Sequence, residues 1–172
     1  MDDSKKKQVE HQQEREEDEA TESTLQFFEG LGISLNLPEI SNSHDFLSQL
    51  VSSDLKVDHI SRGHVTCSFS VQPPIANYYK GLHGGAVAAI TERLATACTR
   101  TIVSEEKPLF LGEMSISYLS AVPMNTKLIA DGSVVRSGRN LTVVSVEIRL
   151  KETKKLVYTA QATFYHFPTA KL

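Results

Sequence analysis

The chain has 172 residues, 40% of them hydrophobic and 23% charged, which predicts a single globular domain with a substantial core. Its net charge of −3 is uneven: residues 1–24 hold four Lys/Arg and nine Asp/Glu (net −5), which leaves fourteen and twelve for the rest (net +2). Since there is no basic stripe and no apolar run near about 18 residues, we expect neither a nucleic-acid partner nor a membrane span.

Residues 1–24 consist largely of Lys, Gln, Glu and Asp with few large apolar side chains. Such a segment cannot bury enough apolar surface to offset the entropy lost on ordering. The composition therefore predicts a disordered acidic tail, helical at most transiently, and an acidic docking segment is the functional alternative. The segment lacks the apolar stretch of a signal peptide and is too acidic for a transit peptide.

Residues 25–53 predict a pair of N-terminal helices. Leu25, Phe28 and Leu31 recur at three-residue steps, and Ser43 is a typical N-cap for the second helix. Such helices pack on the edge of a sheet or cover a pocket, and the sequence leaves both arrangements open.

Residues 54–167 alternate between apolar and polar side chains in six runs. In one of them Val65, Cys67 and Phe69 alternate with polar neighbours, which predicts a strand with one buried face. The six expected strands cover residues 54–60, 63–72, 111–120, 127–136, 141–151 and 156–167. Cys67 and Cys98 fit as small buried hydrophobes and form no metal motif, so we expect a reducing compartment.

One helix is expected between the second and third strands, up to about residue 101. Its apolar residues recur at three- and four-residue steps and predict a core face made of Val87, Ile90, Leu94, Ala97, Cys98 and Thr101. Glu92 and Thr96 lie one turn apart on the opposite side. Their neighbours are small residues, namely Ala88, Ala89, Ala95 and Thr99. A lone glutamate on an alanine and threonine face is unusual for a solvated surface and predicts that another element packs close.

The loop before this helix carries Gly84 and Gly85, whose backbone N–H groups lie at the positive end of the helix dipole. A carbonyl group bound there has donors in place for the oxyanion that forms on attack, and Glu92 is the candidate nucleophile or general base. Each feature also has a structural reading: a tight glycine loop, a histidine that caps the helix, and a solvated glutamate.

The order of elements is two strands, one long helix and four strands. An antiparallel sheet needs an apolar cover on its inner face, and only this helix is long and apolar enough. We therefore predict an α+β fold in which an antiparallel sheet of about six strands wraps round one long central helix.

Asn77, the His83-Gly84-Gly85 triplet and an acid nine residues after the histidine resemble the signature of hotdog-fold acyl-CoA thioesterases, of the phenylacetate-degradation and acyl-CoA thioesterase 13 type. The resemblance extends from about residue 45 to the end. It implies that Glu92 is the base or nucleophile and that the Gly84 N–H polarises the thioester carbonyl. It also implies that Asn77 and His83 order the loop.

The chain departs from this family at one position. Family members carry a serine that positions water at the start of the strand after the helix, where this sequence has Leu111. Other hotdog thioesterases place a threonine one helical turn after a catalytic glutamate, and Thr96 matches that pattern. The hydroxyl is therefore expected from the helix, and the alternative is that no residue identifiable from the sequence holds the water.

The turn between the fourth and fifth strands is the candidate site for coenzyme A phosphates, because guanidinium groups bind phosphate bidentately and a glycine turn exposes N–H groups. Its residues are Arg136, Ser137, Gly138, Arg139 and Asn140. Tyr118 and Ser120 match a segment that lines the ligand groove in the family. An ordinary solvated turn and a plain strand end are the alternatives.

The leading hypothesis is hydrolysis of an acyl-CoA thioester to free acid and coenzyme A, in lipid metabolism, without a metal or redox cofactor. The resemblance implies a homodimer or homotetramer with sites at the subunit interface. The alternatives are a non-catalytic hotdog acyl-CoA-binding protein and an enoyl-CoA hydratase. The second is disfavoured because hydratases of this fold use an aspartate and histidine pair on a differently shaped loop. The acyl group stays open.

Residues 168–172 are expected to form a targeting tail, because Ala170-Lys171-Leu172 resembles the Ser-Lys-Leu address that a peroxisomal import receptor reads. Peroxisomal delivery is the prediction and a cytoplasmic location the alternative. Deleting Leu172 from a fluorescent fusion is expected to disperse it from peroxisomes. Unchanged punctate fluorescence would contradict the address.

Overall fold

The computed structural model describes residues 3–30, 49–51 and 55–166 of the chain. The chain divides into two compact units, Met1–Ser43 and His44–Leu172. The expected cap of the second N-terminal helix, Ser43, and the expected targeting tail lie outside the described residues. Residues 49–51 are helical, and Val51 is buried in the core of the second unit.

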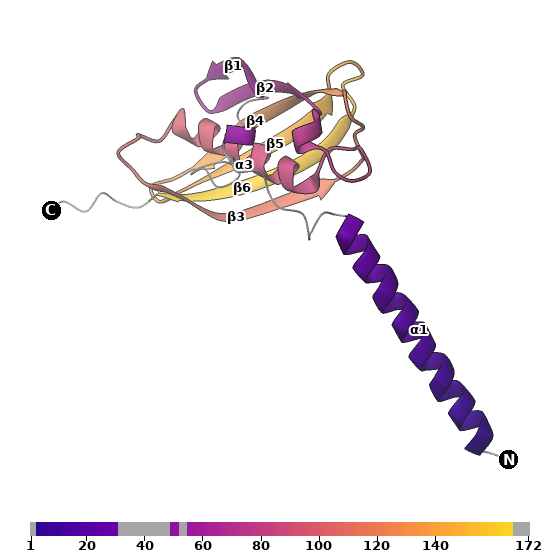
Figure 1. Ribbon diagram of the computed structural model, residues 1–172. Helices are drawn as coiled ribbons and strands as arrows, with labels where there is room; N and C mark the ends of the chain where they lie inside the picture. The colour runs from indigo at the N-terminus through magenta and orange to yellow at the C-terminus, as the bar shows by residue number, and fades with distance from the viewer. Residues whose placement is uncertain (1–2, 31–48, 52–54, 167–172) are drawn as a thin grey trace. The chain divides into compact units, whose positions relative to one another are not determined.

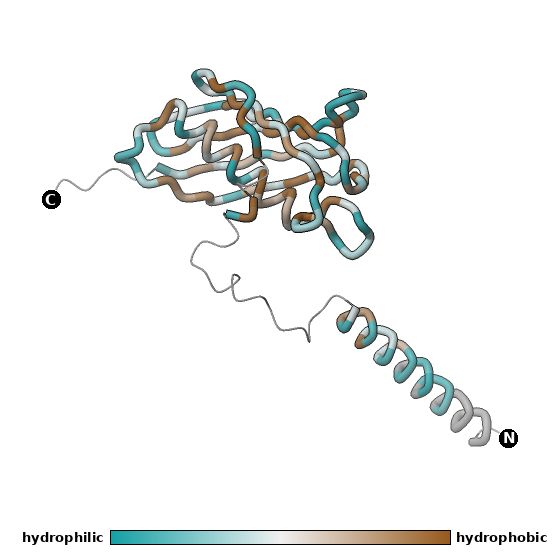
Figure 2. Tube along the Cα trace, turned by 45° about the horizontal axis from the view of Figure 1, so that its top comes forward, coloured by the Kyte–Doolittle hydropathy of each residue, from teal (hydrophilic) through white to brown (hydrophobic). Residues whose placement is uncertain are grey.

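The first unit contains one long helix, α1 (Asp3–Gly30). It covers the range in which composition predicted a disordered tail as far as residue 24, so the structure differs here from the expectation. The segment has no glycine or proline before Gly30 and is rich in strong helix formers, so helix propensity favours it although it buries little. Its side chains are exposed wherever the structure describes them, and Figure 2 shows the mainly hydrophilic helix with hydrophobic residues near Gly30.

The second unit is a six-stranded antiparallel sheet that packs against the helix α3 (Gly84–Arg100), which lies across one of its faces (Figure 1). The strand order is β1-β2-β4-β5-β6-β3, and the short 3-10 helix η2 (Pro73–Ile75) follows β2. The strands are β1 (Lys56–Ser61), β2 (His64–Ser70), β3 (Leu109–Tyr118), β4 (Lys127–Ser137), β5 (Leu141–Leu150) and β6 (Leu156–His166). The α+β prediction is confirmed, and each expected strand is present within about three residues of its expected ends.

The centre of the sheet meets α3 because alternate residues of β4 and β5 are small or branched and face the helix. Leu128 and Ala130 of β4 and Val146 of β5 are at most 1% exposed. At Gly132 a Cβ atom would lie 2.6 Å from Cys98 Sγ, so glycine is what allows the helix to approach this closely.

The buried face of α3 is wider than the spacing predicted. Thr91, Ala95 and Thr99 are buried, whereas Ala97, which we expected in the core, is exposed. Thr101 is only half-buried, and its hydroxyl accepts the Gly63 N–H. The reason is that a sheet curving round a helix covers a broad arc of it. Thr99 tolerates burial because its hydroxyl donates to the Ala95 carbonyl at 2.9 Å.

Strand β3 forms one edge of the sheet and is covered less completely than the strands at its centre. Its inward-facing Leu109, Leu111, Met114 and Ile116 are only half-buried. Tyr118 at its end is 53% exposed. The edge strand therefore carries an apolar face that α3 alone does not fill.

Candidate active site

Asn77 organises the loop that leads into α3. Its side-chain oxygen accepts the N–H groups of Tyr79 and Gly81, each at 3.0 Å. Its backbone N–H donates to the Gly81 carbonyl at 2.7 Å, while Lys80 adopts a left-handed φ of 59°. A short polar side chain that satisfies a tight turn in this way is typical of asparagine. The structure thus places Asn77 where the expected loop-ordering role requires it.

His83 is the N-cap of α3, with its Nδ1 accepting the Gly85 N–H at 2.9 Å. This contact leaves little room for a side chain at Gly85, because a Cβ there would lie 3.1 Å from Nδ1 and the imidazole would have to shift. The Gly84 N–H, in contrast, donates to no acceptor among the described residues. The first turn of α3 therefore presents the Gly84 N–H as an unused donor at the positive end of the helix dipole.

The orientation of Gly84 is held by the end of β3. The Tyr118 hydroxyl donates to the Gly84 carbonyl at 3.0 Å, and its ring packs edge-on against Tyr158 with centroids 5.7 Å apart. Burial raises the pKa of the Tyr158 phenol, with a smaller contribution from Tyr118. Tyr118, expected to line a ligand groove, thus also positions Gly84. Ser120, which follows Tyr118 by two residues in the sequence, is half-buried.

Glu92 and Thr96 open into one cavity of about 350 Å³ on the side of α3 that faces β3 and β6. The wall opposite them is apolar and is formed by Leu109 and Leu111 of β3 and Phe164 of β6. The predicted face of α3 is therefore the wall of a cavity. Leu111, the residue found in place of the family's serine, contributes no hydroxyl to it.

The remaining residues that line this cavity are Val51, Ala89 and Arg93. Arg93 was not among the site residues predicted from the sequence. Its position next to Glu92 was the available signal, since an arginine is as unusual as a glutamate on an alanine and threonine face. No ion pair joins Arg93 to Glu92 in the part of the chain that the structure describes. The guanidinium is thus free to meet an anionic group at the cavity mouth.

Gly84 and Glu92 do not meet within one chain. They are eight residues apart on the same helix, which at 1.5 Å per residue separates them by about 12 Å along its axis. Neither Gly84, His83 nor Asn77 lines the cavity that Glu92 shares with Thr96. The structure therefore gathers the predicted catalytic residues into two groups rather than one.

The turn at residues 136–140 lies at the far end of the sheet from Gly84. The Asn140 carbonyl accepts the His166 N–H, and His166 pairs with Leu109 at the start of β3, whereas Gly84 contacts Tyr118 at its end. A ten-residue strand spans about 30 Å. All five residues from Arg136 to Asn140 are exposed.

One expectation for this turn is wrong. The Gly138 N–H was expected to be open to a phosphate, but it donates to the Leu141 carbonyl at 2.8 Å and closes the hairpin. The Ser137 hydroxyl is bonded to Thr142, which is bonded in turn to the buried His166. The turn therefore has two exposed guanidinium groups, Arg136 and Arg139, and its glycine N–H closes the hairpin.

The two cysteines are poor nucleophiles, as expected for core residues. Burial raises the pKa of the Cys98 thiol to about 12, and it raises the pKa of Cys67 as well. Among the described residues no group of three His, Cys, Asp or Glu side chains is placed to hold a metal ion. No helix in the same ranges is long and apolar enough to cross a membrane.

Comparison with known proteins shows what this chain is similar to. Residues 79–157 match a family model described as the Thioesterase superfamily. The human acyl-coenzyme A thioesterase 13 is 27% identical over 104 residues, which cover 59% of this chain and 71% of the human protein. The mouse protein of the same name is 25% identical over 100 residues, 56% of this chain and 69% of its own.

Solved thioesterase structures share the fold. Zebrafish thioesterase superfamily member 2 superimposes with a TM-score of 0.66 at 24% identity, over 75% of this chain and 91% of that one. A hypothetical thioesterase of Streptococcus pneumoniae, solved with coenzyme A, gives a TM-score of 0.60 at 24% identity, over 67% and 87% of the two chains. These structures confirm the hotdog fold. The resemblance to thioesterases is confirmed, and the family model and the curated relatives support thioester hydrolase activity.

Proposed function

We propose that this chain, whose residues 79–157 match the thioesterase superfamily and whose fold is the hotdog fold, hydrolyses acyl-CoA thioesters to free acid and coenzyme A. The observation that carries the proposal is the cavity in which the Glu92 carboxylate and the Thr96 hydroxyl face an apolar wall. An acyl chain fits the apolar side of such a cavity, and water fits between the carboxylate and the hydroxyl.

In the proposed reaction the Gly84 N–H binds the thioester carbonyl oxygen. It stabilises the negative charge that develops there when the carbonyl carbon is attacked. Glu92 either removes a proton from the attacking water, which Thr96 helps to hold, or attacks the carbon itself. The C–S bond then breaks, and the coenzyme A thiolate takes up the proton that Glu92 removed from the water. In the route by direct attack, the thiolate takes a proton from solvent, and water then hydrolyses the acyl-Glu92 anhydride to release the acid and restore the carboxylate.

The active site is proposed to consist of residues from two copies of the chain. Gly84 and Glu92 of one chain are about 12 Å apart along α3, too far for both to act on one carbonyl group. Strand β3 is an edge strand whose apolar face is half-covered. If two copies pair antiparallel along β3, the end of one strand, beside Gly84, lies next to the start of the other, beside the Glu92 cavity.

The same pairing brings the turn at 136–140 of one copy toward Gly84 of the other, since that turn lies at the same end of the sheet as the start of β3, with β6 between them. Arg136 and Arg139 are then the proposed contacts for the phosphates of coenzyme A. A homodimer is thus the smallest assembly with complete sites, and a homotetramer is two such dimers. Peroxisomal delivery through Ala170-Lys171-Leu172 stays a proposal that rests on the sequence.

We expect Glu92→Gln to lower kcat for acyl-CoA hydrolysis by at least about a hundredfold, because it removes the base or nucleophile. The fold should survive, since Glu92 is exposed and makes no hydrogen bond among the described residues. The measurement is release of free thiol from a panel of aliphatic and aromatic acyl-CoAs. Glu105→Gln, which removes an exposed carboxylate after α3, is the matched control and should retain activity.

Full activity of Glu92→Gln would remove this residue from the mechanism. Saturable acyl-CoA binding by wild type, without thiol release from any substrate, would instead support the non-catalytic binding protein.

Gly84→Pro tests the oxyanion donor without disturbing the helix. Gly84 is the first residue of α3, where proline is well tolerated, and His83 already has the extended backbone that a following proline favours. The change removes only an N–H with no acceptor in the described chain. We expect kcat to fall by about 10²–10³-fold with little change in melting temperature.

Gly84→Ala is the matched control, because it keeps the N–H. Its Cβ would meet the Tyr118 ring at 3.5 Å, an ordinary contact, so activity should be retained. Equal activity in the proline and alanine variants would exclude the Gly84 N–H as the donor.

Mixing the two inactive variants tests the two-chain site. In a mixed dimer of Glu92→Gln and Gly84→Pro chains, one site combines the intact Gly84 with the intact Glu92, and the other site has neither. Refolding the two together at equal amounts should therefore restore about a quarter of wild-type activity, since half of the dimers are mixed. No recovery, in a mixture shown to contain mixed dimers, would place each active site within a single chain.

A further inference from the structure

A second cavity, of about 370 Å³, lies at the corner of the sheet where β4 begins and β5 ends, and it is lined by three lysines. Its lining residues are Lys56, Lys127, Lys151, Ser68, Ser70, Gln72 and Phe69. The proposed hydrolysis of thioesters uses none of them. The cavity has no acidic side chain in its lining.

The strand register explains why these side chains converge. Lys56 of β1 pairs with Ser68, and Ser70 pairs with Lys127, so their side chains share one face of the sheet. This is the face away from α3, because Cys67 and Phe69, which alternate with the serines, are buried in the core. Lys151 lies on the same face beside Lys127. Its N–H donates to the Lys127 carbonyl, and this bond extends the pairing of β4 with β5 by one residue.

This arrangement is unfavourable without a counter-charge. Like charges directly opposite one another on neighbouring strands destabilise a sheet, and Lys127 lies opposite Lys151. Among the described residues none of the three lysines has an ion pair. Glu152 lines a neighbouring hollow with Lys127 but makes no ion pair with it.

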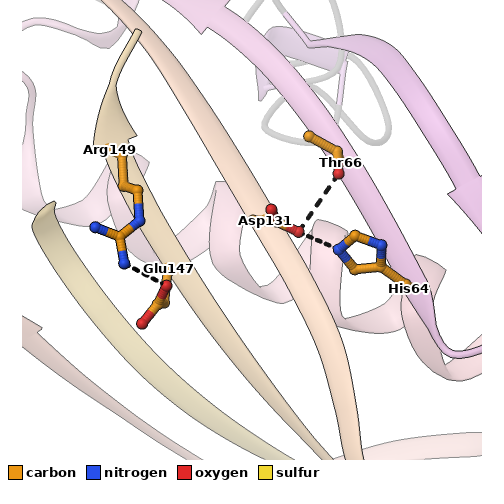
Figure 3. Close-up of polar contacts among 5 residues, drawn as sticks. All are labelled: His64, Thr66, Asp131, Glu147 and Arg149. Atoms are coloured by element: carbon orange, nitrogen blue, oxygen red, sulfur yellow. Dashed lines mark hydrogen bonds and ion pairs between the residues drawn. The ribbon is translucent and has the colours of Figure 1, made fainter. Parts of the chain in front are cut away.

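The carboxylates on the same outer face are already engaged. Asp131 is bonded to His64 and Thr66, and Glu147 is bonded to Arg149, as Figure 3 shows. They cannot neutralise the lysines without giving up these partners. The corner therefore holds three ammonium groups and two hydroxyls with no carboxylate in the lining of its cavity and no ion pair to its lysines among the described residues.

We propose that this cavity is a binding site for a phosphate group. Three ammonium groups supply charge-assisted hydrogen bonds to phosphate oxygens, and Ser68 and Ser70 supply hydroxyl donors of fixed position. The site is separate from the turn at 136–140, because Lys127 begins β4 while Ser137 ends it. It does not depend on the proposed hydrolysis of acyl-CoA.

The test is isothermal titration calorimetry of the full chain with inorganic phosphate at constant low ionic strength. Wild type should bind saturably, and Lys127→Gln and Lys151→Gln should each raise Kd about tenfold or more, because each removes a charged donor. Both variants should also melt at a higher temperature than wild type in phosphate-free buffer, because a like-charge pair is relieved. Lys107→Gln, which removes an exposed lysine between α3 and β3, should match wild type in both measurements.

Absence of saturable phosphate binding by wild type, or equal Kd values for wild type and both corner variants, would overturn the proposal. Titration with adenosine 3′,5′-bisphosphate identifies the source of the phosphate. Tighter lysine-dependent binding than that of inorganic phosphate would assign the site to a nucleotide such as the end of coenzyme A. Equal or weaker lysine-dependent binding would assign it to free phosphate.

Discussion

The packing of α3 against the centre of the sheet determines where every candidate site residue lies. Leu94 and Cys98 approach β4 so closely that only a glycine fits at position 132. Core packing of this density leaves little freedom for the helix to turn or slide. As a result Glu92 and Thr96 are held toward the β3 side of the sheet, where they form one wall of a cavity.

A rigid helix also keeps its two functional groups apart. The Gly84 N–H is at the first turn of α3 and Glu92 is more than two turns further on, so no change of side-chain rotamer brings them together. The same helix leaves the apolar face of β3 half-covered. In the proposed dimer, a second copy along this edge would bury that face and would also supply the second of the two proposed catalytic groups.

Two groups of basic side chains lie at opposite ends of the strand pair formed by β4 and β5. Arg136 and Arg139 lie at the turn that joins β4 to β5, while Lys127 and Lys151 lie at the other end of this strand pair. Between them the outer face of the sheet carries paired side chains such as Asp131 with His64 and Glu147 with Arg149. The two proposed sites for anionic groups therefore lie at opposite ends of this strand pair, and neither uses the Gly138 N–H.

The sequence was sufficient to predict the six strands, the central helix and the resemblance to a thioesterase family. Alternation placed all six strands, since a period of two is a local property of the backbone, and the His83-Gly84-Gly85 triplet with Glu92 predicted the family. It misplaced Ala97 in the core, because helical spacing gives the direction of a face but not how far a sheet wraps round it. The expectation of a disordered tail also differs from the structure. It rested on how little apolar surface this segment can bury, whereas the helix α1 forms there because its residues have high helix propensity.

Tertiary structure alone decided how the residues are grouped. Glu92 and Thr96 share a cavity with Leu111 because β3 pairs with β6 and both strands pack against α3. These contacts join residues that are far apart in the sequence. The closing of the hairpin by the Gly138 N–H and the convergence of three lysines at one corner have the same origin. The sequence by itself determined which chemical groups are present and on which kind of element. Only strand pairing and helix packing decided which of them meet, because those distances are set by non-local contacts.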